Sequence, residues 1–259
     1  MTRRLVTAIA VLGYVALLLP LILLMLWSFN ASRSGARWDG FTFDWYRRLL
    51  GRQDLLAALR TSLVVGASAT VASTGLGLFG ALALGRERSR VSAAVESLLI
   101  FPIVTPEVVA GISLLILFTA AGVHLGLGTV IVAHITFCLP FTVLVIGARL
   151  RGMDRSLEEA ALTLGADEAT AFRRVTVPML MPGIIAAALL AFTLSFDDFI
   201  VTFFTAGPGT STLPLVIYGM VRRTVEPTVN ALSALLVVAT TVLLVAGQRW
   251  MRPDARGRA

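Results

Sequence analysis

The sequence contains no lysine, so all 22 of its basic residues are arginine. This absence excludes a phosphate-binding loop that ends in Gly-Lys-Ser/Thr, and it excludes a Schiff-base lysine. Charge of either sign is scarce, because only 14% of the 259 residues are charged while 57% are hydrophobic. With a mean hydropathy of +0.86, the chain is too apolar for a water-soluble domain of this length. We infer that lipid surrounds most of it and that it is not its own ATPase.

Cysteine and histidine are also rare. Cys138 is the only cysteine, so an internal disulfide is excluded and a packing role is expected. His124 and His134 are too isolated in the sequence for a metal site, and we assign them no function. The net charge of +7 could suggest nucleic acid, but the arginines lie in short segments between apolar runs, where they usually set membrane orientation. We expect no metal, no cofactor bound by this chain and no nucleic-acid partner.

Six stretches are apolar enough to cross a bilayer as helices of about 20 residues, with membrane lipid as their partner. They are residues 5–28, 61–84, 97–120, 125–148, 182–205 and 229–250. The first is longer than the core of a secretion signal, and we interpret it as a retained anchor. The second is rich in small residues, which favour close packing against partner helices. The sequence thus predicts an all-α integral membrane protein with a single transmembrane domain over residues 1–259.

The arginines favour cytoplasmic N- and C-termini, because 14 of the 22 then lie in cytoplasmic segments. The first outer loop opposes this trend, since residues 33–60 carry several arginines together with Trp38 and Trp45. We interpret this loop as an interfacial amphipathic helix. Trp45 is either an anchor at the membrane interface or a ring that stacks on an ammonium group where a solute enters.

The longest cytoplasmic loop, residues 149–181, carries signals for two short helices. Ser156 followed by Glu159 forms a capping box, and Gly165 is a suitable stop. An apolar stripe at helical spacing lies between them, formed by Leu157, Ala160, Ala161 and Leu164. The loop is either a connector that lies on the membrane or a docking point for another protein.

Asp167 can cap the second helix, with Glu168 as a favourable charge in its first turn. We expect this helix to run through Phe172 and to end at Pro178 and Pro182, before the fifth span.

The segment Glu159-Ala-Ala161, with Gly165 four residues later and then Val175-Thr-Val-Pro178, resembles the EAA loop of the permease subunits of ABC importers. The family has isoleucine and leucine where this chain has Val175 and Val177. The resemblance implies a type I ABC importer permease (MetI-like) fold, with this loop as the coupling helix that docks on a cytoplasmic ATPase. The residues that would couple to the ATPase are Ser156, Glu159, Ala160, Ala161, Gly165 and Glu168.

A resemblance over most of the chain points to spermidine/putrescine permease subunits. The matching segments are Phe101-Pro-Ile-Val-Thr-Pro-Glu-Val-Val-Ala-Gly111, Ser195-Phe-Asp-Asp-Phe199 and Gly207-Pro-Gly-Thr-Ser-Thr-Leu-Pro214. The resemblance implies four partners: a second permease subunit, an ATPase dimer that uses ATP-Mg, and an extracytoplasmic polyamine-binding protein, together with lipid. Permeases for iron, thiamine, sulfate or aminophosphonates share much of this framework, so these substrates stay open.

The residues that cost the most free energy to place in a membrane are Glu107, Asp197 and Asp198, and the two predicted spans that hold them, 97–120 and 182–205, contain no arginine to pair with them. Adjacent aspartates on a helix point about 100° apart, so at most one faces a pathway while the other caps a helix or meets a partner. Ser195 either lines the same cavity or bonds to its own helix. We expect a negative field that receives a cation such as a polyamine.

Pro102 and Pro106 predict that the third span is broken near Glu107.

Two other classes of function compete with a permease subunit. A self-sufficient secondary transporter explains the acidic residues but not the capped loop. A membrane enzyme has little support, because the sequence offers no metal-ligand cluster and no nucleophile elbow.

Overall fold

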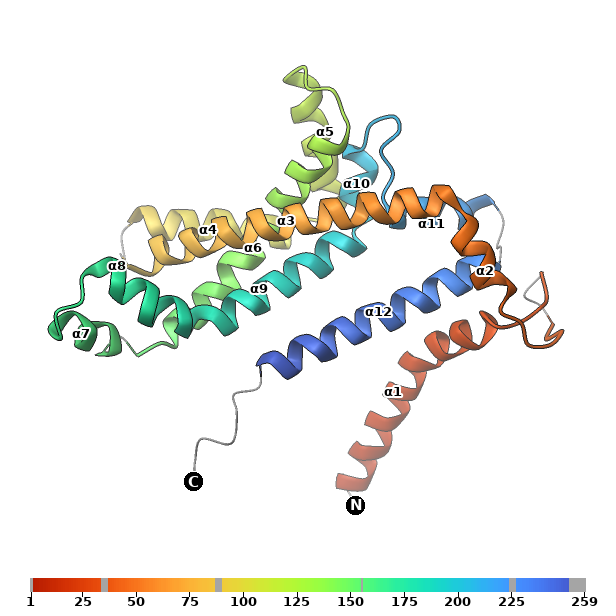
Figure 1. The fold of residues 1–259 in the computed structure, drawn as a ribbon, viewed down its shortest axis with the longest axis horizontal. Helices are drawn as coiled ribbons and strands as arrows, with labels where there is room; N and C mark the ends of the chain where they lie inside the picture. The colour runs from red at the N-terminus through yellow and green to blue at the C-terminus, as the bar shows by residue number, and fades with distance from the viewer. Residues whose placement is uncertain (1, 34–36, 87–89, 155, 224–226, 252–259) are drawn as a thin grey trace. The chain divides into compact units, whose positions relative to one another are not determined.

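The computed structural model describes residues 2–33, 37–86, 90–154, 156–223 and 227–251. Apart from one isolated bridge between Asn30 and Phe41, the regular structure of these ranges is helical. The backbone forms two compact units, one of Met1–Ala57 with Val216–Ala259 and the other of Ala58–Leu215 (Figure 1). The single domain expected from the sequence stays a prediction. Arg88, Arg155, Arg252, Arg256 and Arg258, which support the predicted orientation, lie outside the described residues.

Four described helices are long and apolar enough to cross a membrane, or five if a bent pair is counted as one broken span. The four are α1 (Thr2–Trp27), α3 (Gln53–Arg86), α6 (Leu127–Arg151) and the continuous helix that ends with α9 (Val177–Asp197). The bent pair is α4 (Arg90–Val104) with α5 (Glu107–Ala120). The predicted sixth span lies within α12 (Pro227–Met251), whose described apolar part, Pro227–Val242, is shorter than a full crossing. The all-α membrane fold is confirmed.

The first unit contains α1, α2, α12 and most of α11 (Leu213–Arg223), and α12 packs against α1 and α2. It also contains the predicted amphipathic helix, which is α2 (Asp44–Gly51). Trp45 and Leu49 lie on the buried face of α2. The Trp45 indole N–H donates to the Asn30 carbonyl across 2.7 Å, so the turn before α2 is held by a buried hydrogen bond.

In the second unit, α6 packs along α9. Glycines of α3 lie against side chains of both helices, Gly66 against Phe192 of α9 and Gly77 against Thr142 of α6. At Gly183 a Cβ atom would come within 2.7 Å of the Arg149 Cβ, so only glycine permits this approach of α9 to α6. The Thr142 hydroxyl donates to the Ser73 carbonyl of α3 across 2.8 Å. The close packing predicted for the second span is confirmed, since lipid offers no hydrophobic drive for helix association.

Between α6 and α9 lie α7 (Ser156–Thr163), α8 (Glu168–Ala171) and a π-helical turn, η1 (Phe172–Thr176). The prediction that Pro178 and Pro182 end a helix here is wrong, because α8, η1 and α9 form one continuous helix. A proline lacks its N–H and crowds the carbonyl four residues back. The wider turn of η1, where the Val177 N–H donates to the Phe172 carbonyl, accommodates Pro178 without breaking the helix.

Candidate functional site

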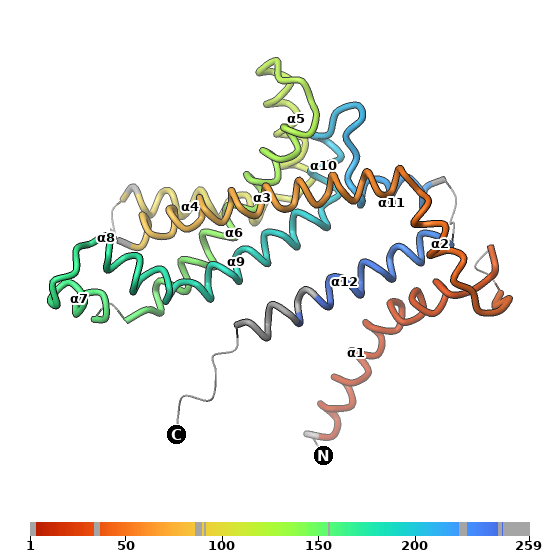
Figure 2. The backbone as a smooth tube through the Cα atoms, in the orientation of Figure 1, coloured from red at the N-terminus to blue at the C-terminus, as the bar shows by residue number. Residues whose placement is uncertain are grey.

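The third span breaks where the sequence predicted. Helix α4 ends at Val104, Pro106 is extended, and α5 begins at Glu107 after a bend of 109° (Figure 2). The Glu107 side chain therefore lies in the first turn of α5, where the positive end of the helix dipole favours a carboxylate. Glu107 is exposed in this chain, so its charge is available to a solute or to another subunit.

The fifth span is broken as well, and the sequence did not predict this break. Helix α9 ends at Asp197, Asp198 is extended, and a short helix α10 (Ile200–Thr205) follows. The Asp198 carboxylate caps α10, because its two oxygens accept the backbone N–H groups of Val201 at 3.1 Å and Thr202 at 2.9 Å. The prediction that one aspartate caps a helix is therefore correct, and the structure assigns that role to Asp198.

His134 on α6 pairs with Asp198, so this carboxylate has a partner within the spans that the sequence did not predict. Its Nε2 atom is 3.3 Å from an Asp198 carboxylate oxygen and 2.9 Å from the Thr202 hydroxyl. Its Nδ1 atom is 2.7 Å from the Ser195 hydroxyl, and Thr202 also donates to Asp198 across 3.1 Å. All four side chains are buried. We call His134, Ser195, Asp198 and Thr202 the His134 cluster.

The predicted pathway residues of the second unit come together around the two breaks. Helix α5 packs against α10 (Figure 1), and a Cβ at Gly111 of α5 would meet the ring of Phe204 at 2.7 Å. Glu107 lies within electrostatic reach of Asp197 and Asp198. Asp197 is exposed while Asp198 is buried. The carboxylate of Asp197 is therefore accessible to a solute, and that of Asp198 is not.

Ser195 and Trp45 have other surroundings than the sequence suggested. Ser195 is buried in the His134 cluster, so its hydroxyl bonds to another helix and not to an open cavity. Trp45 belongs to the first unit, and its ring is buried with the Arg48 guanidinium 5.0 Å from the ring centre. The structure thus joins Ser195 and Asp198 through His134 and places Glu107 within electrostatic reach of both aspartates, while Trp45 belongs to α2 of the first unit.

The predicted coupling loop forms two short helices with a tight bend, as expected. Gly165 has φ of +92°, a left-handed conformation that favours glycine, and the Ala166 N–H donates to the Ala161 carbonyl across 3.1 Å. Asp167 caps α8, since its carboxylate accepts the Thr170 N–H at 2.8 Å. The Thr170 hydroxyl and backbone N–H hold the pKa of Asp167 below its usual range.

The start of α7 differs from the predicted capping box. Ser156 is already the first helical residue, and its backbone N–H donates to the Asp154 carboxylate across 3.0 Å. The Ser156 backbone and hydroxyl lower the pKa of Asp154. Most of the proposed coupling residues are exposed, namely Ser156, Glu159, Ala160, Gly165 and Glu168, and Ala161 is half-buried.

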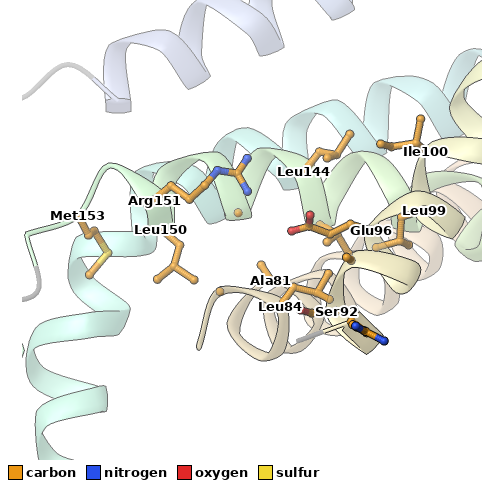
Figure 3. A pocket seen from close by; sticks show the side chains of 15 residues that line it. Ala81, Leu84, Ser92, Glu96, Leu99, Ile100, Leu144, Leu150, Arg151 and Met153 are labelled. Atoms are coloured by element: carbon orange, nitrogen blue, oxygen red, sulfur yellow. The ribbon is translucent and has the colours of Figure 1, made fainter. Parts of the chain in front are cut away.

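Two hollows lie near this loop, at the ends of the helices that flank it. The larger, of about 990 Å³, lies between α3, α4 and α6, and the side chains of Glu96 and Arg151 face it (Figure 3). The smaller, of about 240 Å³, is lined by Glu158 and Glu159 of α7 together with Thr176 of η1. Neither hollow was predicted from the sequence, because each is formed by residues from segments far apart in the chain.

Comparison with known proteins gives a family match and similar curated proteins. Residues 73–257 match the family described as "Binding-protein-dependent transport system inner membrane component". The chain is 41% identical to the spermidine/putrescine transport system permease protein PotC of Escherichia coli (strain K12), over 94% of this chain and 92% of that protein. It is 40% identical to the putrescine transport system permease protein PotI of the same strain, over 91% of this chain and 86% of that protein.

Solved structures with a similar fold are ABC importers. A bacterial ABC transporter involved in the import of the acidic polysaccharide alginate has a TM-score of 0.73 at 16% identity, with 98% of each chain covered. The MetNI methionine ABC transporter in inward-facing conformations has a TM-score of 0.60 at 20% identity, over 80% of this chain and 96% of that chain. These likenesses confirm the type I importer permease fold.

Proposed function

The chain belongs to the family of binding-protein-dependent transport inner-membrane components, the permease subunits of ABC importers, and we propose on this premise that it forms half of a polyamine pathway. It is a multi-pass protein of the inner membrane. We propose that its N- and C-termini are cytoplasmic, as the distribution of the arginines favours. The similarity to PotC and PotI, over more than nine tenths of the chain, supports a polyamine as the cargo.

The observation that carries the choice of cargo is the pair of exposed carboxylates at the two helix breaks. Glu107 begins α5 and Asp197 ends α9, and the helices that bear them are otherwise strongly apolar. Carboxylates at membrane depth are stable when they face water or meet a cation. A polyamine carries ammonium groups separated by methylene chains, so it can meet both carboxylates and lay its apolar segments on neighbouring aromatic rings.

The exposed loop supports an importer that is driven by a separate ATPase. Leu164, which follows α7, is 88% exposed, and α7, Gly165 and α8 form a short exposed segment that we call the coupling segment. Leu157 and Leu162 of α7 are exposed as well, and a group of exposed apolar side chains on a folded loop fits a surface that docks on a partner. We propose that the coupling segment docks on an ATPase dimer that uses ATP-Mg. A second permease subunit and an extracytoplasmic polyamine-binding protein complete the transporter.

Coupling is tested with the assembled transporter in vesicles, by measuring ATP-driven uptake of labelled spermidine for Gly165→Val. We expect uptake to fall to background, because a β-branched residue strains the left-handed conformation at φ +92° that sets the bend between α7 and α8. The matched control is Gly122→Val, at another glycine of positive φ with no atom near its missing Cβ. Equal losses for both variants would argue against a coupling role of this turn.

The cargo is tested by competition. We expect unlabelled spermidine and putrescine to compete for uptake, while iron, thiamine, sulfate and aminophosphonates do not. If only one of those solutes competed, that solute and not a polyamine would be the cargo, and the chain would still be assigned to an importer. Uptake by this chain alone, without ATP, would favour a self-sufficient secondary transporter.

A further inference from the structure

The His134 cluster joins three helices through the side chains of four residues. His134 lies near the middle of α6, Ser195 lies two residues before the end of α9, and Thr202 belongs to α10. Sequence separations of 61 and 68 residues divide His134 from its two hydroxyl partners. The imidazole is 1% exposed. A buried polar ring in an apolar span is costly unless both nitrogens have partners, and here both do.

One arrangement of protons satisfies the whole cluster. With a proton on Nε2 the ring donates toward Thr202 and Asp198, and its Nδ1 atom shares a hydrogen bond with the Ser195 hydroxyl. The Thr202 hydroxyl then donates to Asp198. Asp198 receives hydrogen bonds from two backbone N–H groups and one hydroxyl in addition to the nearby ring. Little acceptor capacity remains on this carboxylate for an ammonium group.

We propose that His134 is a positioning residue of the translocation pathway: by holding Asp198 as the cap of α10 it fixes the break after α9 and leaves Asp197 and Glu107 to meet the cation. The division of roles follows from burial. Asp198 is 8% exposed, whereas its neighbour Asp197 and Glu107 are both exposed. This inference rests on the proposed polyamine transport, because it assigns the carboxylates of that same pathway.

The first experiment separates positioning from binding by the kinetics of spermidine uptake in the assembled transporter. His134→Leu removes both ring nitrogens, and we expect its Vmax to fall at least about tenfold while KM stays within about twofold. His134→Gln retains a side-chain N–H donor and should recover a substantial part of that Vmax. Asp197→Asn should instead raise KM. A rise in KM for His134→Leu that equals the rise for Asp197→Asn would overturn the proposal.

The only other histidine supplies the matched control. His124 is exposed in the connection between α5 and α6. We expect His124→Leu and His124→Gln to leave Vmax and KM unchanged. If His124→Leu reduced Vmax as much as His134→Leu does, the effect would not be specific to the cluster and the proposal would fail.

The second experiment needs no substrate, so it distinguishes a wrong cargo from a wrong role for His134. His134→Leu leaves Asp198 as a buried charge without its ring partner, and we expect the midpoint of thermal unfolding in detergent to fall by several degrees. Adding Asp198→Asn removes the charge and keeps a side chain that caps helices, so the double variant should melt at a higher temperature than His134→Leu. Additive losses from the two changes would contradict the proposal.

Discussion

The two helix breaks in the second unit present their carboxylates in opposite ways. At the break between α4 and α5, proline interrupts the backbone and Glu107 stays exposed at the start of the new helix. At the break between α9 and α10 there is no proline, and Asp198 is buried as the cap of the new helix with His134 beside it. The Pro106 ring causes the first break. The second break depends on the contact of Asp198 with His134 of α6.

This difference teaches that charge at membrane depth does not by itself identify a binding residue. Asp198 meets its hydrogen-bonding needs within the chain, so its carboxylate stabilises the fold. Glu107 and Asp197 are exposed and keep acceptor capacity for a cation. We therefore expect loss of Asp198 to act on stability, and loss of either exposed carboxylate to act on the affinity for a cationic solute.

The largest effect is expected for Asp198→Ala. The change removes the cap of α10, which typically costs about 0.5–2 kcal/mol, and it leaves the buried His134 ring without its carboxylate partner, which typically costs about 1–3 kcal/mol. We expect little folded protein in the membrane and a strongly lowered unfolding temperature, measured by fluorescence-detected size exclusion during heating. The control is Asp197→Ala at the exposed neighbour, which should unfold like the parent. Equal destabilisation by the two changes would remove the distinction between these aspartates.

A smaller effect, on affinity alone, is expected for Glu107→Gln. The change removes a charge and keeps the shape, so we expect the KM for spermidine to rise about tenfold, which corresponds to about 1.4 kcal/mol. The unfolding temperature should not change, because the side chain is exposed. Uptake kinetics in vesicles and thermal unfolding measure the two quantities. An unchanged KM would show that the exposed carboxylate of the first break does not meet the cation.

The proline at the first break is tested by Pro106→Ala. Alanine restores the backbone N–H and permits a helical conformation, so α4 and α5 can straighten and move Glu107. We expect Vmax to fall severalfold. Pro102→Ala is the matched control, because Pro102 lies inside α4 and does not make the bend. A loss for Pro102→Ala as large as for Pro106→Ala would argue that the position of the break does not matter.

The smallest effect is expected at Asp167, which caps a helix as Asp198 does but is exposed in the loop between α6 and α9. Its pKa is lowered by Thr170, so the ionised cap stabilises α8 at neutral pH and loses this effect only as the pH falls through the lowered pKa. We expect the hydrogen-exchange protection of the Thr170 amide to stay constant between about pH 8 and pH 5. A loss of protection within this range would contradict the lowered pKa.

The sequence predicted the features that depend on local patterns. Apolar runs indicated the spans, Pro106 indicated the break before Glu107, and Gly165 with Asp167 indicated the bend of the loop. Each of these follows from hydropathy or from the backbone preference of one residue. The small residues of the second span likewise predicted close packing, and Gly77 has it against Thr142.

The features that the sequence did not predict depend on contacts between distant segments. His134 was given no function, because nothing near it in the sequence is acidic, yet Asp198 lies beside it in the fold. The break after Asp197 carries no proline or glycine and is stabilised by the His134 side chain of α6. Pro178 does not end a helix, because η1 widens the backbone before it. The one available signal was a histidine inside an apolar span, where a partner is needed.

The most direct test of the central claim is uptake of labelled spermidine into proteoliposomes. They contain this chain, the second permease subunit, the ATPase dimer and the binding protein. We predict uptake that requires both ATP hydrolysis and the binding protein, and that stops when a non-hydrolysable ATP analogue replaces ATP. Equal uptake with the analogue, or without the binding protein, would contradict the assignment of this chain as half of an ATP-driven polyamine importer.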